Sequence, residues 1–301
     1  MKRRDFLKQN TLSSGCLLLP AFLQPVTAQP AENVTVKKLL LIHLNGGNDG
    51  LNTMVPYGSE MYYRKRPKLS IPANKVLRLN DQYGLNPVLL PLWSMYQKGY
   101  LAILDNVASP QPFTSHYAAS NYWEEGYRSL LSNPVTATPI PSFETDAEDF
   151  ECTLLHVAGL LELPSCSPVI KVALDGFDTH NFQRAKHDYL LGTYSKGVET
   201  LVRRLAVKGL LDNTLVITYS EFGRSLAQNT RHGTEHGCAN TVFIMGNQLK
   251  KPGVHGEGDL PLTAHPQPCF ESETLFNTLR KQWFNNPSFA SVSQRQLPAF
   301  L

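Results

Sequence analysis

Short apolar runs that alternate with helix-like segments are the feature that most constrains the fold of this chain. Residues 38–44, 100–104, 168–174, 215–219 and 241–245 are predicted to be strands. Helices are predicted at 87–98, 117–126, 148–161 and 271–284, and in a segment of roughly twenty residues that ends at Val207. This order favours an α/β fold, a doubly wound, mostly parallel sheet flanked by helices.

Two stretches lack a strand or helix pattern. Residues 56–72 are polar and rich in Tyr, and they predict a loop beside the functional edge of the sheet. Residues 127–147 hold three prolines and many Ser and Thr residues, so they predict an exposed connection.

The amino-terminal residues are typical of a twin-arginine export signal. Arg3 and Arg4 precede an apolar stretch at 12–23, and small residues up to Ala28 predict cleavage there. Cys16 offers a weaker alternative, a lipoprotein-type site. The apolar stretch is too short for a bilayer of about 30 Å, so no membrane span is expected in the mature chain. We therefore expect a signal at 1–28, a single domain at 29–301, and a periplasmic or secreted protein exported by the twin-arginine machinery.

Charge and cysteines narrow the function classes. The formal net charge is +3, but residues 1–28 hold four basic residues and one acidic residue, so the remainder is balanced. A basic nucleic-acid-binding surface is therefore not expected. Four cysteines remain beyond the signal and allow one or two disulfides in an oxidising compartment, with Cys152 and Cys166 as the most local pair.

Polar side chains follow four of the predicted strands, where ligands bind in open α/β sheets. They are Asp49, Ser115, Asp178 with His180, and Glu221 with Arg224, while His236 lies in the following loop. Carboxylates that gather at one edge repel one another and lose hydration, and a divalent cation removes both costs. Mixed Asp, Glu and His ligands suit zinc, manganese or iron. We therefore expect one or two ions, zinc first, bound by Asp49, Asp178, His180, Glu221 and His236.

Some of these residues have simpler interpretations. Ser115, or Thr114 beside it, is either a helix cap or a nucleophile next to the metal. Asp49 lies in a Gly-rich turn that favours Asp for conformational reasons. Arg224 either clamps an anionic oxygen or forms a structural ion pair.

Several chemistries are disfavoured by their missing motifs. The loop after the first strand reads GGNDG instead of G-x-G-x-x-G. Its Asp49 carboxylate would face the negative charge of a pyrophosphate, so nicotinamide-cofactor binding is disfavoured. The sequence has no G-x-S-x-G elbow and no phosphate-binding P-loop. Cys166 begins a run like the cysteine motif of sulfatases, but Ile170 stands where that motif requires Arg.

Five ordered motifs resemble a known family. They are residues 41–72, TSHYAASNYWEEG, GFDTHNFQ, SEFGRSLAQN and HGTEHG. Together they resemble the twin-arginine-exported family called domain of unknown function number fifteen hundred and one, a branch of the alkaline phosphatase and sulfatase superfamily. The resemblance implies an alkaline-phosphatase-like sheet and metal-supported cleavage of a small anionic phosphate or sulfate ester.

The resemblance also implies roles for individual residues. Asp178, His180 and His236 would bind a first metal, and Asp49 and Glu221 a second, with Ser115 bridging as nucleophile. The chain departs from the superfamily at Phe222, where the phosphatases have His, and in a short segment at 126–148.

These patterns predict an exported metal-dependent ester hydrolase in which Ser115 or an activated water is the nucleophile. The competing hypotheses are an exported binding or assembly protein that keeps the fold and a metal site, and a structural α/β domain without metal.

Overall fold

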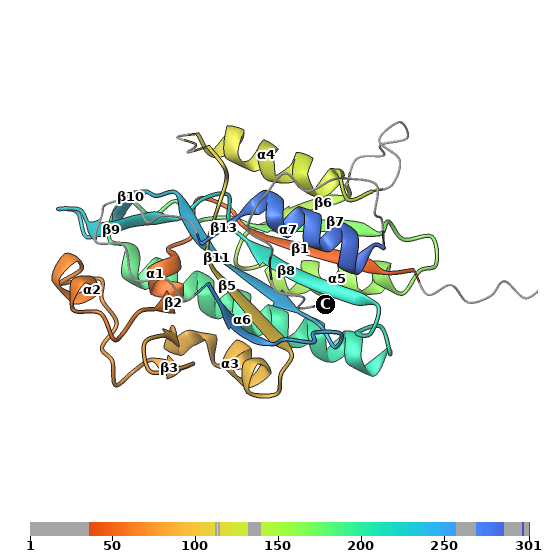
Figure 1. Cartoon of the computed structure of the whole chain (residues 1–301), viewed down its shortest axis with the longest axis horizontal. Helices are drawn as coiled ribbons and strands as arrows, with labels where there is room; N and C mark the ends of the chain where they lie inside the picture. Colours follow the sequence, from red (N-terminus) through yellow and green to blue (C-terminus); the bar gives the residue numbers. More distant parts are fainter. Residues whose placement is uncertain are drawn as a thin grey trace, which may run out of the picture. The chain divides into compact units, whose positions relative to one another are not determined.

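The computed structural model describes residues 36–111, 113, 115–131, 140–256, 269–285, 297 and 301. The predicted export signal lies outside these residues. The main sheet has eight strands (Figure 1). Its order is β12 (Gly253–His255), β5 (Leu101–Ala108), β11 (Ala239–Met245), β8 (Thr214–Tyr219), β1 (Lys38–Leu44), β7 (Val169–Leu174) and β6 (Ser142–Thr145), and β13 (Phe270–Glu271) also pairs with β5.

Most strands of this sheet run parallel, as predicted. β8, β1, β7 and β6 pair in parallel, and β12 and β13 are parallel to β5. β11 is antiparallel to both β8 and β5. No helix separates β8 from β11 along the chain, and a parallel connection would need such a crossover. Every residue of β1 and β8 is buried, because helices cover both faces of the sheet.

The helices divide between the two faces (Figure 1). One core packs α3 (Leu90–Gln97), α5 (Phe150–Leu161) and α6 (Gln183–Val207) on the sheet, with a 3₁₀ turn, η2 (Pro87–Leu89), before α3. The other packs α4 (His116–Arg128), α7 (Ser272–Thr278) and the π-helical turn η4 (Leu279–Trp283). Successive side chains of β1 alternate between the two cores, since strand side chains point to opposite faces. The predicted doubly wound fold is confirmed.

Smaller elements lie beside the main sheet. α1 (Gly50–Thr53) leads into a three-stranded sheet of β2 (Met54–Val55), β4 (Gly84–Leu85) and β3 (Leu77–Arg78). β9 (Arg224–Gln228) and β10 (Thr234–His236) form a hairpin.

Both segments that were expected to be irregular contain regular structure. Residues 56–72 include α2 (Glu60–Lys65), whose Tyr62 is buried in a small core with Val55 and Ile71. Residues 142–145 form the edge strand β6, because they pair with β7 and Phe143 packs against the first core. The prediction of a connection without a strand is therefore wrong for β6, although Ser142 and Glu144 are exposed as predicted, and residues 132–139 lie outside the described part.

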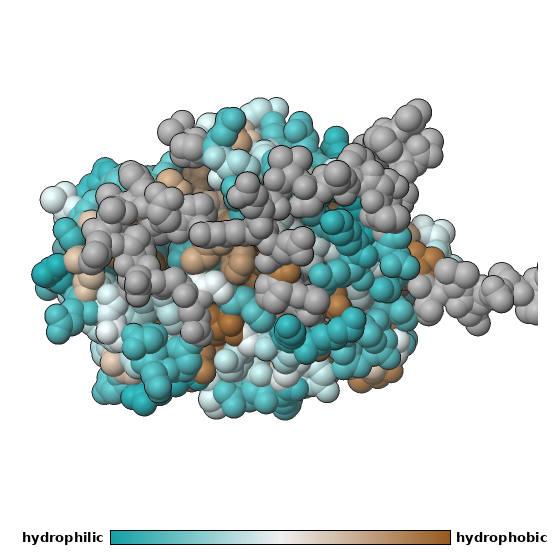
Figure 2. All heavy atoms as spheres, in the orientation of Figure 1, coloured by the Kyte–Doolittle hydropathy of each residue, from teal (hydrophilic) through white to brown (hydrophobic). Residues whose placement is uncertain are grey.

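Three further observations concern surface polarity, the helices and the cysteines of the described residues. Hydrophilic side chains cover much of it on the face shown in Figure 2, and apolar side chains emerge in small groups. None of the helices in the described ranges is both long and apolar enough to cross a bilayer. Cys152 and Cys166 are unbridged thiols, so the local disulfide that the sequence allowed is not formed.

Candidate metal centre

Four side chains from three separate segments converge at one edge of the sheet. Asp178 and His180 follow β7, His236 ends β10, and His116 begins α4. We call these four residues the histidine cluster. Oδ1 of Asp178 lies 3.1 Å from Nε2 of His180, 3.6 Å from Nε2 of His116 and 3.7 Å from Nε2 of His236. Nε2 of His180 lies 3.2 Å from Nε2 of His236.

Several of these donor atoms are spaced as ligands around one ion would be. Ligand atoms about 2.1 Å from zinc lie about 3.4 Å apart at tetrahedral angles. The four measured separations range from 3.1 to 3.7 Å. His116, Asp178 and His236 can each offer one ligand atom within 4.8 Å of the others. These two imidazoles and one carboxylate form a donor set that zinc accepts, with His180 beside them at 3.1 Å from Asp178.

Each of three cluster residues is held by a further polar partner. Nδ1 of His116 contacts Oε1 of Glu221 at 2.6 Å, and Nδ1 of His180 contacts Oε2 of Glu235 at 3.1 Å. A carboxylate on Nδ1 leaves Nε2 to face an ion, which is the arrangement that orients histidine ligands in metalloproteins. Asp178 accepts a hydrogen bond from Arg224 at 2.7 Å.

Local electrostatics favour the metal-binding form of Asp178 and His236 and favour protonation of His116. Burial opposes the charged form of Asp178, but the hydrogen bond and charge of Arg224 outweigh it and lower the pKa of that carboxyl. The pKa of His236 is lowered by burial and by the charge of Arg224, which favours its neutral, ligating form. The hydrogen bond to Glu221 raises the pKa of His116.

Arg224 is buried behind the cluster. Its guanidinium donates to the backbone oxygens of Gly46, Gly47, Phe177 and Thr234, and to the Asp178 carboxylate and Nε2 of His180. These contacts use all of its N–H donors. The geometry therefore suits a residue that holds the loops in place, and it leaves no donor for a substrate oxygen.

Ser115, the predicted nucleophile, is the N-cap of α4. Its Oγ accepts a long hydrogen bond of 3.5 Å from the backbone N–H of Ala118, and the residue is exposed. This is the capping interpretation of the sequence. Thr114 lies outside the described residues.

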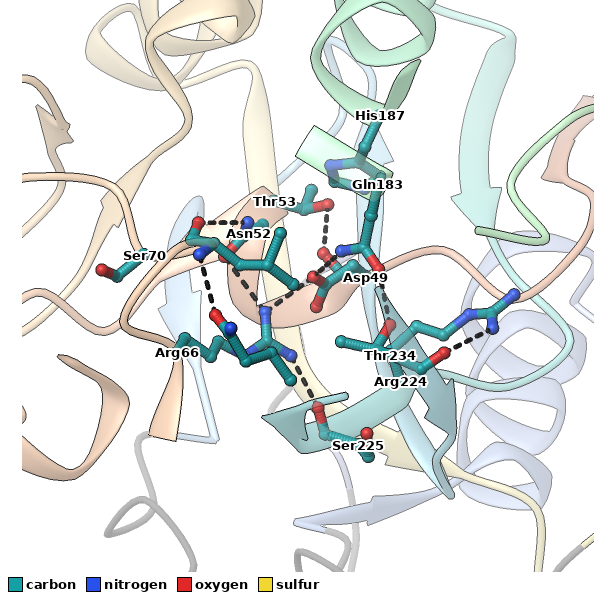
Figure 3. A network of polar contacts seen from close by, with 12 residues as sticks. Asp49, Asn52, Thr53, Arg66, Ser70, Gln183, His187, Arg224, Ser225 and Thr234 are labelled. Carbon is teal, nitrogen blue, oxygen red and sulfur yellow. Dashed lines mark hydrogen bonds and ion pairs between the residues drawn. The ribbon is translucent and has the colours of Figure 1, made fainter. Parts of the chain in front are cut away.

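Asp49 is bound in a different set of contacts (Figure 3). It forms an ion pair with Arg66 at 2.6 Å and accepts a hydrogen bond from Gln183. Arg66 also donates to Asn52 and to the backbone oxygens of Ser225 and Leu226. We call Asp49, Asn52, Arg66 and Gln183 the arginine network. Among the described residues, the polar contacts of Asp49 are with this network and not with the histidine cluster, and Arg66 neutralises its charge.

Glu221 reaches the site from behind. Its Oε1 contacts His116 and accepts from the backbone N–H of Gly46, while its Oε2 contacts Nε2 of His43 at 2.9 Å. Both oxygens are therefore occupied by donors. Phe222, which stands where the phosphatases have His, lies 4.6 Å from the rings of both His116 and His236.

The sequence prediction missed His116 and His43. His116 follows Ser115 directly in the motif TSH, so a histidine at the start of this helix was a signal in the sequence. His43 lies inside the first predicted strand, where a buried histidine looks like part of the core.

A tight hairpin turn helps to place two of the histidines. The backbone N–H groups of Phe182 and Gln183 donate to the backbone oxygens of Arg231 and His232. A Cβ on Gly233 would lie 2.2 Å from backbone atoms of His180, so only glycine permits this approach. The β9–β10 hairpin is thereby docked on the loop that carries His180.

Comparisons with known proteins agree with the expected family. Residues 164–298 match the model of the family described as "Protein of unknown function (DUF1501)". This match contains the motifs with Asp178, His180, Glu221 and His236, and it confirms the resemblance found from the sequence. No curated protein matches the chain.

Solved structures with a similar arrangement share little sequence with this chain. The lipoteichoic acid synthase LtaP from Listeria monocytogenes is 10% identical over 73% of this chain and 68% of its own, with a TM-score of 0.42. The periplasmic domain of EptC from Escherichia coli is 10% identical over 88% and 90%, with a TM-score of 0.44. A putative sulfatase from Bacteroides thetaiotaomicron is 12% identical over 87% and 74%, with a TM-score of 0.47. At these identities and scores, the similarities carry no conclusion about activity.

Proposed function

We propose that this protein is an exported, metal-dependent hydrolase of small phosphate or sulfate esters, built on one divalent ion at the histidine cluster. The observation that carries the proposal is the convergence of His116, Asp178 and His236, each of which can offer a ligand atom within 4.8 Å of the others, with His180 3.1 Å from Asp178. Zinc fits this donor set best, with manganese and iron as alternatives. The ester chemistry comes from the resemblance to the alkaline phosphatase and sulfatase superfamily.

The contacts favour one ion over two. Asp49 is paired with Arg66, both oxygens of Glu221 accept hydrogen bonds, and Phe222 places an apolar ring beside His116 and His236. The ligands that a second ion would need are therefore engaged elsewhere or replaced by an apolar side chain.

Some residues of the site would bind the ion, and others hold those ligands in position. A bound divalent ion would supply Lewis acidity toward a non-bridging oxygen of the ester. Asp178 is 52% exposed on its side chain, and the three cluster histidines are about one-third exposed, so a small ester can reach them from solvent. Arg224, Glu221 and Glu235 hold the donors in place. Ser115 lies next to His116 and is exposed, so it or a water is the nucleophile.

A second candidate is an exported binding or assembly protein that keeps the metal site without turnover. Two observations favour it. Ser115 caps α4. Among the described residues outside the cluster, no hydroxyl or thiol is hydrogen-bonded to a cluster histidine. A site in which His180 joins the other three donors would also have four protein ligands, and structural zinc sites are closed in this way.

Metal analysis and an ester screen separate these functions. Protein purified from the exported fraction is expected to hold one zinc ion per chain, and His180→Ala and His236→Ala should lose it. The zinc-loaded protein should release nitrophenol from p-nitrophenyl phosphate or p-nitrophenyl sulfate, and the two variants should not. Bound zinc without product would favour the binding protein. Full metal content in both variants would overturn the site itself.

Export is tested independently of the site. We propose that the twin-arginine machinery delivers the protein to the periplasm or the exterior, on the evidence of Arg3 and Arg4 before an apolar stretch. Replacing both arginines with lysine should retain the precursor in the cytoplasm, as cell fractionation would show. Unchanged export of that variant would contradict the assignment.

A further inference from the structure

We propose that Glu221 is a positioning residue that fixes the orientation and tautomer of His116, so that Nε2 of this histidine completes the metal site. The inference depends on the metal centre proposed above. It differs from the expected role of Glu221 as a ligand, because its carboxylate acts on the ion only through a histidine.

The carboxylate of Glu221 is buried and surrounded by donors. Its side chain is 0% exposed. Oε1 lies 2.6 Å from Nδ1 of His116 and 2.9 Å from the backbone N of Gly46, and Oε2 lies 2.9 Å from Nε2 of His43. Among the described residues, only these two histidines form ion pairs with it. This buried carboxylate has three N–H partners, of which two are imidazoles and none is a guanidinium. Its charge therefore acts on the two histidines.

This contact determines which nitrogen of His116 faces the cluster. A carboxylate on Nδ1 requires the proton there, so Nε2 carries the lone pair when the ring is neutral. Nε2 is buried and has no hydrogen-bond partner among the described residues, and it lies 3.6 Å from the Asp178 carboxylate. A buried lone pair that faces an anion is unfavourable, and a cation between them removes the conflict. The orphaned nitrogen thus points independently to a ligand at this position.

His43 supports the same arrangement from the opposite side. Its ring stacks on Tyr219 with centroids 4.8 Å apart, so its Nε2 is aimed at Oε2 of Glu221. The backbone oxygen of Glu221 also accepts a hydrogen bond from Nε1 of Trp123, which ties α4 to the end of β8. Side-chain variants of Glu221 keep this backbone contact, so they test the carboxylate alone.

Zinc affinity provides the first test. Glu221→Gln retains one acceptor and should weaken zinc binding about tenfold in a chelator competition, whereas Glu221→Met retains none and should weaken it about a hundredfold. Asp105→Asn is the matched control, since Asp105 is a buried carboxyl on β5 whose side-chain contacts are Asn106 and Thr241. The control should bind zinc as tightly as the wild type. Equal affinity in all four proteins would overturn the proposal.

The tautomer provides a second test that requires no metal. In alkaline buffer, ¹⁵N NMR of the metal-free wild type should show the His116 proton on Nδ1, and Glu221→Met should lose this preference. A proton on Nε2 in the wild type would contradict the inference even if zinc binds. A wild type that binds no zinc but shows the Nδ1 tautomer would reject the proposed hydrolase and leave the role of Glu221 in orienting His116 intact.

Discussion

The arginine network and the histidine cluster both follow strands of the same sheet, but they neutralise their carboxylates differently. Asp49 and Arg66 are both 0% exposed and lie 2.6 Å apart. Asp178 also contacts an arginine, yet half of its side chain is exposed and three imidazole nitrogens surround it. A buried carboxylate that already has a guanidinium has no need of a cation. Since each carboxylate contacts a guanidinium, the comparison shows that exposure and the surrounding imidazoles separate the structural Asp49 from the candidate ligand Asp178.

The largest expected effect belongs to the arginine network. Arg66→Met leaves the Asp49 charge buried without its partner, so we expect unfolding to become easier by about 3–5 kcal/mol. Urea denaturation measures this loss. The double variant with Asp49→Asn should recover part of it, because the unpaired charge is then absent. A loss under about 1 kcal/mol would show that the network is not the structural element that the geometry describes.

Zinc should act only on the histidine cluster. Free zinc at about a hundredfold the Kd should raise the free energy of unfolding by about 2.7 kcal/mol. Zinc should stabilise Arg66→Met by the same amount, although this variant has a lower free energy of unfolding without zinc. It should not stabilise His236→Ala. Thermal unfolding with and without a chelator measures both. If Arg66→Met loses the increment as well, the two regions are coupled and the comparison fails.

Acid should weaken the buried region through His187. This residue is buried beside the arginine network, and its Nε2 contacts the Asn48 side chain at 2.9 Å. Burial lowers its pKa, so below about pH 6.5 the unfolded chain binds a proton that the folded protein does not. The free energy of unfolding should therefore decrease as the pH falls below that point, by at most about 1.4 kcal/mol per pH unit. Above that point the contribution of His187 to stability is fully present.

His187→Gln is the control variant for this pH dependence of stability. Glutamine can still donate to Asn48 but does not titrate in this range. Its stability should fall less steeply between neutral pH and pH 5 in urea titrations of metal-free protein. Identical slopes in the two proteins would assign the acid sensitivity to other groups.

The smallest effect is expected at Ser115. Replacing it with Ala removes the N-cap of α4 and should cost about 1 kcal/mol, without changing zinc content. Equilibrium unfolding measures the stability, and metal analysis measures the zinc content. If the variant keeps its stability but loses ester turnover, Ser115 is the nucleophile and not merely a cap.

Much of the fold follows from local sequence patterns. β1, β7 and β8 appear as apolar runs because both of their faces are buried, and α6 ends at Val207 as predicted. The antiparallel direction of β11 did not follow, since strand direction depends on how the chain returns to the sheet. β6 was missed because an edge strand of four residues carries little pattern among prolines.

The sequence by itself determined which loops leave the sheet at the functional edge, because strand periodicity and Gly-rich breaks are local properties. It therefore placed Asp178, His180 and His236 in loops that meet. Only the tertiary structure decided which side chains share a centre. Arg66 reaches Asp49 from just after α2, and Glu221 turns toward His43 and His116. These choices depend on charges brought together from distant segments, and no spacing along the chain records them.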